Sequence, residues 1–460
     1  MTDRKYELGH ERVGKLLFRY STPAMTAMLA NSLYNLVDTI FVGQGAGKLA
    51  LAALAVSFPI QMFILAVAQV VGIGSASVIS RSLGAGDARK AERTAGTSFA
   101  VVAVLSAVLM VLGLLFLNPL LRAFGATPKV LPYASDYLSI VFCGSIFFAF
   151  AVSSNNIVRS EGNAKVAMAS MIIGATVNVV LDPILIFGLD MGIRGAALAT
   201  ITGQFCSFLF LCRYFLSGRS LLQIRRWDLK PDWRVLPEVF RIGASSFTRV
   251  AAGSAMAIVL NNSIAHYGGD IHLAVMGVTH RTLMVLFMPL IGLVHGLQPI
   301  VGFNYGARNM DRVRQAIRTA TATATAISSA GFLLLMLFPR PVLGMFSSDS
   351  ELLTEGPPIV RVMVICLPVV GFHIVGTTLF QAIGKAGPAL FLSMSRQVLL
   401  VVPLVLILPL RFGLPGIWAS FPLADAVSTL ITGAWVLSEI RRLKNHPPPA
   451  TDGTPIEAEL

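Results

Sequence analysis

Long apolar stretches separated by short polar ones dominate the sequence from end to end. Windows of about 19 residues, the length that crosses hydrocarbon as a helix, predict twelve membrane-spanning segments. They cover residues 16–42, 49–78, 95–117, 133–156, 166–188, 194–216, 238–266, 271–300, 315–338, 358–381, 388–410 and 415–438. Each must be helical, because a helix satisfies its own backbone hydrogen bonds where water is absent. The alternating ten-residue segments of a membrane barrel are missing, so we expect an all-α integral membrane protein.

The two halves of the chain repeat each other at a spacing of 222 residues. Matched pairs with this spacing are Arg19 and Arg241, Gly84 and Gly306, Pro119 and Pro341, and Gly162 and Gly384. Each half holds six predicted helices, an even number, so both halves enter the membrane in the same direction. We therefore expect two six-helix bundles related by a pseudo-two-fold axis along the membrane normal, as in transporters.

This repeat divides the chain into four regions. We expect an N-terminal bundle at 1–217, a basic cytoplasmic linker at 218–237 and a C-terminal bundle at 238–440. The remaining segment, 441–460, is polar and rich in proline, which predicts a disordered cytoplasmic tail.

Composition and charge agree with a membrane protein. Hydrophobic residues make up 55% of the chain and charged residues only 13%, about half of what a soluble protein carries. The net charge of +13 would suggest nucleic acid as a partner of a soluble protein. Here 27 of the 36 Lys and Arg fall on one side of the predicted topology, including Arg396 in the segment 382–396. This asymmetry predicts cytoplasmic termini, the cytoplasmic (inner) membrane and the lipid bilayer, not nucleic acid, as the surroundings.

Two carboxylates interrupt the apolar spans of the first half. One ends a polar stripe on a single face of the first helix, formed by Asn31, Tyr34, Asn35 and Asp38. The other, Asp182, shares a helix face with Asn178 four residues earlier. Thr202 and Tyr137 come at a similar depth on neighbouring helices. An ionisable group in hydrocarbon costs a few kcal/mol, so the cluster predicts a site that holds a proton or binds a cation. A polar cluster that only fixes helix packing is the alternative.

The second half lacks these acids. Adding 222 to the positions of Asp38 and Asp182 gives Leu260 and Leu404, so we expect ion coupling to reside in the N-terminal bundle. Ionisable residues near mid-depth in the second half are Arg249, Arg281 and Asp425. They either form a buried salt bridge among themselves or line the cleft between the bundles.

Pro23 interrupts the first helix 15 residues before Asp38. It removes one backbone hydrogen bond, which predicts either a hinge in the helix that carries the acid or a static bend. Catalytic and metal-binding motifs are missing from the sequence: the four cysteines lack CxxC spacing, the seven histidines form no HExxH, and no Walker motif occurs. We therefore expect neither an enzyme nor a metal site.

Four segments resemble motifs of the multidrug and toxic compound extrusion (MATE) family. They are NLVDTIFVG (35–43), RSEGNAK (159–165), NVVLDPILIFGLDMGIRGAALAT (178–200) and GLVHGLQPIVGFNYGARN (292–309). The resemblance covers the chain up to its tail and implies the two-bundle fold. It also implies that Asp38 and Asp182 are coupling-ion residues, with Asn178, Thr202 and Tyr137 beside them. The acids that some members carry in the seventh and tenth helices are absent, which argues against a sodium site in the second bundle.

The function predicted is secondary active antiport by alternating access. Such a protein would export amphipathic organic cations or drugs in exchange for protons or sodium, with no other cofactor, and we expect a monomer. Asn35, Arg281 and Asp425 are the candidates for residues of the substrate cleft. A lipid-linked oligosaccharide flippase is the alternative, but its cleft would need several cationic residues for a pyrophosphate, and Arg249 and Arg281 are the two candidates.

Overall fold

A computed structural model describes residues 2–346 and 349–445, and the regular structure within these ranges is helical. The first half contains α1 (Thr2–His10), α2 (Val13–Gly45), α3 (Gly47–Gly84), α4 (Ala88–Leu115), α5 (Leu117–Ala123), α6 (Leu131–Ser160), α7 (Ala164–Pro183), η1 (Ile184–Gly188) and α8 (Gly192–Leu216). A connecting segment with the short η2 (Arg226–Leu229) leads to the second half. That half contains α9 (Leu236–Gly306), α10 (Met310–Leu337), α11 (Pro339–Gly344), α12 (Ser350–Val364), α13 (Leu367–Ala382), α14 (Ala386–Met394), η3 (Ser395–Val401), α15 (Val402–Ile407), α16 (Pro409–Phe412) and α17 (Leu414–Asn445).

These helices account for the twelve predicted crossings. Nine helices of the described ranges are long and apolar enough to cross a membrane. α9 supplies two of the crossings, because Gly269 breaks it with a φ of 73° that favours glycine. α12 and α13 together form one more, bent by 47°. α2, with 33 residues and the polar stripe, completes the set. The predicted tail at 441–460 begins inside α17, and its residues 446–460 lie outside the described ranges.

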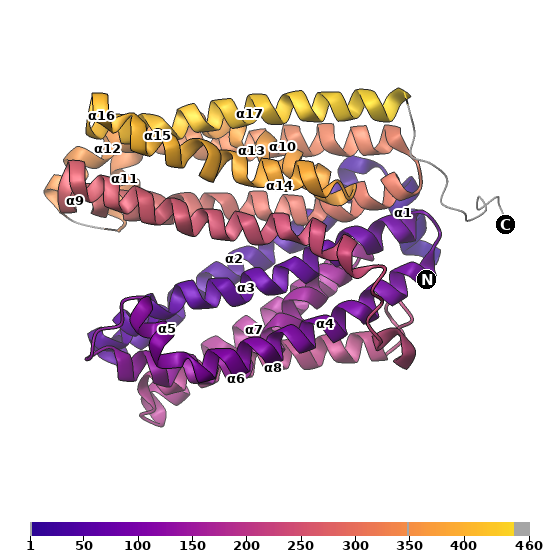
Figure 1. The fold of residues 1–460 in the computed structure, drawn as a ribbon, viewed down its shortest axis with the longest axis horizontal. Coiled ribbons are helices and arrows are strands. Elements are labelled where there is room, and N and C mark those ends of the chain that lie inside the picture. The colour runs from indigo at the N-terminus through magenta and orange to yellow at the C-terminus, as the bar shows by residue number, and fades with distance from the viewer. Residues whose placement is uncertain (1, 347–348, 446–460) are drawn as a thin grey trace.

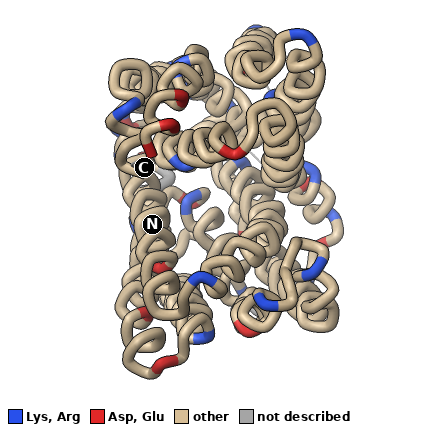
Figure 2. The backbone as a smooth tube through the Cα atoms, turned by 90° about the vertical axis from the view of Figure 1, so that its left-hand side faces the viewer, with Lys and Arg blue, Asp and Glu red and all other residues tan. Residues whose placement is uncertain are grey.

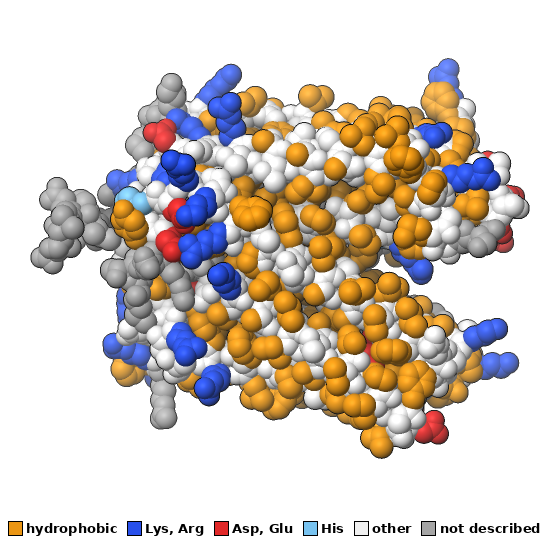
Figure 3. Space-filling model, turned by 180° about the vertical axis from the view of Figure 1, so that it is seen from behind, with side chains coloured by type: hydrophobic (Ala, Val, Ile, Leu, Met, Phe, Trp, Pro, Cys, Tyr) orange, Lys and Arg blue, Asp and Glu red, His pale blue; other side chains and the backbone are white. Residues whose placement is uncertain are grey.

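The helices form two bundles that touch at one end and separate at the other. In Figure 1 the lower bundle holds α2 to α8 and the upper bundle holds α9 to α17. Viewed from the open end, many helices of both bundles are seen nearly end-on, so their axes are roughly parallel (Figure 2). α1 and the end of α17 lie at the closed end. The space-filling view shows the hollow between the bundles at the opposite end (Figure 3).

Apolar packing follows the same division. One large cluster joins both bundles at the closed end and includes Leu17, Ile79, Leu293, Leu297 and Phe380. Two further clusters each lie within one bundle toward the open end, around Leu138 in the first and around Val360 in the second. The two bundles therefore share one core where they touch and keep separate cores where they diverge.

The closed end is sealed by direct contact of helix backbones. Gly74 of α3 faces Val239 of α9, and Gly243 of α9 faces Val70 of α3. A Cβ atom at either glycine would overlap the opposing carbonyl oxygen. Small residues allow such close approach of membrane helices, so these two glycines set the distance between the bundles.

Charged side chains concentrate at this closed end. Lys and Arg gather there on the face shown in Figure 3, whereas apolar side chains cover most of the length of both bundles. A long apolar surface with charge at its ends is the form expected of an integral membrane protein.

Candidate functional site

The two acids predicted from sequence meet inside the N-terminal bundle. Asp38 in α2 is 8% exposed and Asp182 at the end of α7 is fully buried. Their carboxyl groups lie within hydrogen-bonding reach of each other. α7 passes directly into the π-helical segment η1 after Pro183, and such wide turns recur at functional sites. The irregular end of α7 therefore carries the acid.

Asn178 holds Asp182 in place. Its Nδ2 donates to Asp182 Oδ1 at 3.4 Å and to the Thr200 hydroxyl of α8 at 3.4 Å. Thr202, the threonine predicted from sequence, instead donates to the Leu198 carbonyl in its own helix at 2.7 Å. Thr200, not Thr202, therefore connects α8 to this cluster, by accepting a hydrogen bond from Asn178.

Two tyrosines complete the surroundings of the acids. Tyr137 of α6 is 3% exposed, and it and Tyr34 of α2 lie close enough to both carboxyl groups to interact electrostatically. The Gln61 side chain of α3 lies near the Tyr137 hydroxyl. Five helices of one bundle thus contribute to a single polar cluster.

The cluster has acceptor atoms to spare. Asp38 Oδ1, Asp182 Oδ2 and Asn178 Oδ1 are buried without a hydrogen-bond partner. Within the described ranges no Lys or Arg forms an ion pair with either acid. Two ionised carboxylates in contact away from water repel each other, so the pair needs a proton or a bound cation. Carboxylate and amide oxygens are suitable ligands for a small hard cation.

The buried acid of the second bundle has a basic partner. Asp425 of α17, 3% exposed, accepts a hydrogen bond from Arg396 Nε at 2.5 Å. Asp425 does form a buried salt bridge, but its partner is Arg396. The prediction that Asp425 pairs with Arg249 or Arg281 is therefore wrong. The charge count above also assigns Arg396 to the cytoplasmic segment 382–396, which is wrong. Arg396 lies in the π-helical η3, within the crossing formed by residues 386–412.

An aromatic ring and a buried histidine lie near this ion pair. The Arg396 guanidinium lies over the Phe287 ring at 6.0 Å, and His373 Nδ1 is 2.8 Å from the Thr432 hydroxyl beside it. The charge of Asp425 is therefore balanced by Arg396 within its own bundle, and Asp425 is enclosed by the ion pair instead of lining the cleft.

The remaining cleft candidates are exposed. Arg281 and Arg249 in the two arms of α9 are both open to solvent, as is Asn35 of α2. Asn35 Nδ2 donates to the Asn31 carbonyl at 2.7 Å. Pro23 is buried within α2, which continues as a helix on both sides of it.

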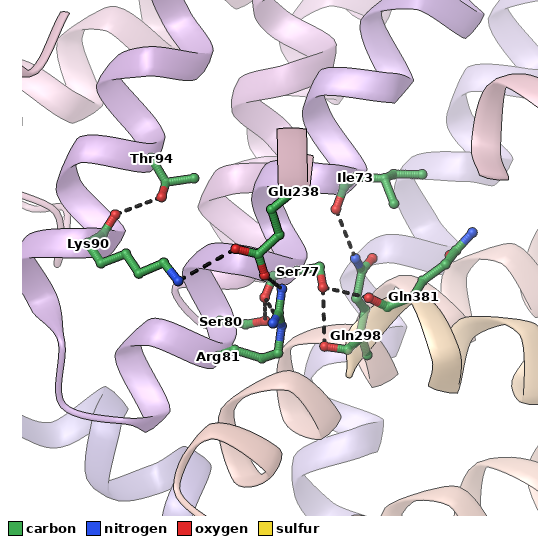
Figure 4. Close-up of polar contacts among 10 residues, drawn as sticks. Ile73, Ser77, Ser80, Arg81, Lys90, Thr94, Glu238, Gln298 and Gln381 are labelled. Carbon is green, nitrogen blue, oxygen red and sulfur yellow. Dashed lines mark hydrogen bonds and ion pairs between the residues drawn. The ribbon is translucent and has the colours of Figure 1, made fainter. Parts of the chain in front are cut away.

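A set of polar contacts crosses between the bundles at the closed end (Figure 4). Glu238 of α9 accepts from Arg81 of α3 at 2.8 Å and pairs with Lys90 of α4 at 3.5 Å. Ser77 of α3 donates to the Gln381 carbonyl of α13 at 2.5 Å. We call the group Arg81, Lys90 and Glu238 the closing ion pairs, because they hold the ends of the two bundles together.

Two helical bundles that meet at one end of a membrane-crossing molecule, with a buried acidic cluster in one of them, define an integral membrane transport protein. The comparisons give the family. The MatE family model matches the chain twice, at residues 23–184 and 246–407, and the chain belongs to this family. The two matches fall in the two bundles, in agreement with the internal repeat.

Relatives and solved structures agree. The multidrug export protein MepA of Staphylococcus aureus is 25% identical over 428 residues, covering 93% of this chain and 94% of that protein. A multidrug resistance MATE family transporter solved in an outward-facing conformation is 28% identical with a TM-score of 0.90, covering 96% and 98% of the two chains. A MOP superfamily transporter from Pyrococcus furiosus, described as having reversed polarity of its binding pocket, is 29% identical with a TM-score of 0.90, covering 95% and 98%.

Sequence reasoning missed several polar residues of the site. Gln61 and Thr200 are polar residues in otherwise apolar spans, and that contrast could have singled them out. Arg396 is also a charged residue within a predicted span, 388–410, although the count of cytoplasmic Lys and Arg includes it in the neighbouring segment 382–396. Its partnership with Asp425 depends on how α14 and α17 pack.

Proposed function

We propose that the protein is a secondary active antiporter that exports amphipathic organic cations or drugs in exchange for protons or sodium. The observation that carries this proposal is the Asp38–Asp182 contact, which lacks a positive partner among the described residues and leaves acceptor atoms free. Such a pair can take up and release a cation as the cleft opens and closes. The names of the MepA relative and of the outward-facing transporter support drug export.

Alternating access would work through the closed end. In the structure the hollow opens away from the termini (Figure 3). With the termini in the cytoplasm and the protein in the inner membrane, as the distribution of Lys and Arg favours, this is an outward-open state. Opening toward the cytoplasm would require the glycine contacts and the closing ion pairs to separate. We further propose that the protein works as a monomer, with Pro23 as a bending point in α2.

The test uses purified protein in proteoliposomes loaded with a fluorescent amphipathic cation. A pH gradient and a sodium gradient are imposed separately, and dye movement is followed. We expect one gradient to drive transport, and Asp38→Asn or Asp182→Asn to reduce it to the rate without a gradient. Asp136→Asn is the matched control, because this exposed acid pairs with Arg194 outside the cluster. Gradient-driven transport at the normal rate in both cluster variants would disprove the proposal.

The second candidate is the lipid-linked oligosaccharide flippase. The observation in its favour is that Arg249 and Arg281 are exposed on α9 without an acidic partner in the described residues, and the Pyrococcus furiosus protein shows that pocket polarity varies on this fold. A flippase would move its lipid in the absence of either gradient, and Asp38→Asn would leave that movement unchanged.

A further inference from the structure

The floor of the cleft, where the two bundles begin to separate, carries two arginines and a histidine that come from both bundles. Arg159 comes from α6, Arg249 from the first arm of α9 and His295 from its second arm. Both arginines lie close enough to His295 to act on it electrostatically. Neither arginine has an acidic neighbour within the described part of the chain. Positive charge therefore accumulates here without compensation.

Arg159 is the buried member of this group. It is 6% exposed, and its Nη2 donates to Asn156 Oδ1 at 2.9 Å. Asn156 is itself fixed by a hydrogen bond to Gln69 of α3 at 3.1 Å. A guanidinium has five donors, and a buried charge without a counter-charge is costly. The amide holds the guanidinium in place but does not neutralise it.

Arg249 faces the opposite bundle. It follows Ile242 by two helical turns and so shares its face of α9, and Ile242 belongs to a small apolar cluster that also contains Val78 of α3 at the closed end. Arg249 itself is exposed and lies six residues beyond Gly243, about 9 Å further along the helix. It therefore projects into the cleft directly above the seal.

His295 lies between two glycines, Gly292 and Gly296, that contact Met25 and Ser21 of α2. It is 9% exposed and forms the lower boundary of the group. α2, α6 and both arms of α9 thus surround a single small region.

We propose that this basic floor, formed by Arg159, Arg249 and His295, binds the anionic group of the transported amphipathic molecule, a carboxylate or a phosphate. Arginine suits both, because its planar donors bind two oxygens at once. The inference rests on the proposed function only in taking the ligand to be a transported molecule. Asp38 lies 13 residues beyond Met25 of α2, about 20 Å above the seal, so cation and anion sites occupy different depths. The substrate class that fits is zwitterionic or acidic amphipaths.

The experiment measures equilibrium binding to the purified full-length protein in detergent, by fluorescence polarisation. The probes are a cationic rhodamine methyl ester and the corresponding free carboxylic acid, which differ at one group. We expect the acid to bind more tightly than the ester. Arg249→Gln should weaken binding of the acid about tenfold and leave the ester within about twofold, and Arg249→Lys should recover most of the loss.

Two further variants locate the site. Arg411→Gln removes an exposed positive charge at the outer end of the same bundle and should change neither probe. Arg281, eleven residues from Gly292 on the same helix face, lies about 16 Å above the seal, so Arg281→Gln should have a smaller effect than Arg249→Gln. Arg159→Gln should weaken binding of the acid more than that of the ester, and the melting temperature reports whether the variant is folded.

Several outcomes would overturn the inference: equal affinity of the native protein for acid and ester, equal weakening of both probes in Arg249→Gln, or a larger effect of Arg281→Gln. Short-chain phosphatidic acid and free inorganic phosphate serve as competitors. Displacement of the acid probe by the lipid alone indicates an amphipathic phosphate ligand, and displacement by neither restricts the site to carboxylates. Because no gradient is used, this result stands apart from gradient-driven transport. A protein that binds the acid through Arg249 but shows no coupled transport would refute only the proposed function.

Discussion

The interiors of the two bundles differ although their folds repeat. In the N-terminal bundle the buried carboxyl groups of Asp38 and Asp182 meet each other, with no basic partner among the described residues. In the C-terminal bundle the buried carboxylate of Asp425 meets Arg396. The first arrangement places two acidic groups together without a counter-charge, whereas the second is neutral by itself.

The repeat explains how this difference arose on one scaffold. The positions 222 residues after the two acids are Leu260 and Leu404, which belong to the same apolar cluster of the second bundle. Conversely, the residue 222 positions before Arg396 is Gly174, which has no side chain. Apolar packing thus replaces the ion cluster in one bundle, and an ion pair occupies other positions there. The proposed ion exchange therefore has a candidate site in one bundle and none at the equivalent positions of the other.

The largest expected effect concerns the ion pair of the second bundle. Arg396→Met strands the Asp425 carboxylate in a buried site and should lower the free energy of unfolding by about 3–5 kcal/mol. The measurement is thermal unfolding in detergent. Arg396→Met combined with Asp425→Leu should recover most of the loss, because no charge is then left unpaired. The exposed pair Arg194–Asp136 is the control, where Arg194→Met should cost about 0–1 kcal/mol. Equal losses at both pairs would remove the contrast between the bundles.

The next effect concerns the seal, to which both bundles contribute a glycine. Gly74→Val and Gly243→Val should each disfavour the closed end by about 1–3 kcal/mol, the cost of overpacking, because either side chain would meet an opposing carbonyl. Spin labels at Arg93→Cys and Asp311→Cys, with the four native cysteines replaced by serine, report the distance between the bundles. Gly253→Val lies on the same helix as Gly243 with no atom closer than 3.8 Å to the added carbon, so it should leave the distance unchanged. If only one of the two substitutions changed the distance between the bundles, the description of Gly74 and Gly243 as equivalent contacts would be wrong.

A smaller effect of opposite sign is expected for the carboxyl pair. Asp182→Asn relieves the repulsion between the two acids without stranding a base, so it should raise the free energy of unfolding by about 1 kcal/mol. Thermal unfolding at neutral pH without added sodium measures it. A loss of several kcal/mol would mean that the pair serves mainly to hold the bundle together, like Asp425 and Arg396.

The smallest effect is expected at the closing ion pairs. Glu238→Gln removes the partner of both Arg81 and Lys90, but Glu238 is 33% exposed, so the closed end should lose only about 0.2–1 kcal/mol. The labels at positions 93 and 311 should show a slight increase in the open population, and salt should have the same effect on the native protein. In the Glu238→Gln protein the response to salt should be reduced. If salt shifted the open population equally in the native and Glu238→Gln proteins, the salt-sensitive contact would not be the closing ion pairs.

The hydrophobic pattern determined the helices of this protein, because a crossing needs a fixed length of apolar residues whatever surrounds it. All twelve predicted spans correspond to helices or bent helix pairs, down to the break near Gly269. The same rule singled out Asp38 and Asp182, because any acid within an apolar span stands out. The 222-residue repeat predicted two equivalent bundles before their packing was known.

Pairings between helices were decided by the tertiary structure alone. The sequence of a span does not show which neighbouring helix each of its faces meets. The pairing of Asp425 with Arg396 therefore depended on helix rotation and on the π-helical turn of η3. The pairing of Asn178 with Thr200, instead of Thr202, depended on the rotation of α8. The convergence of Arg159, Arg249 and His295 has the same origin: residues far apart in sequence meet only because two bundles close at one end and part at the other. The bilayer fixes which residues form helices, and side-chain packing fixes which of their polar groups meet.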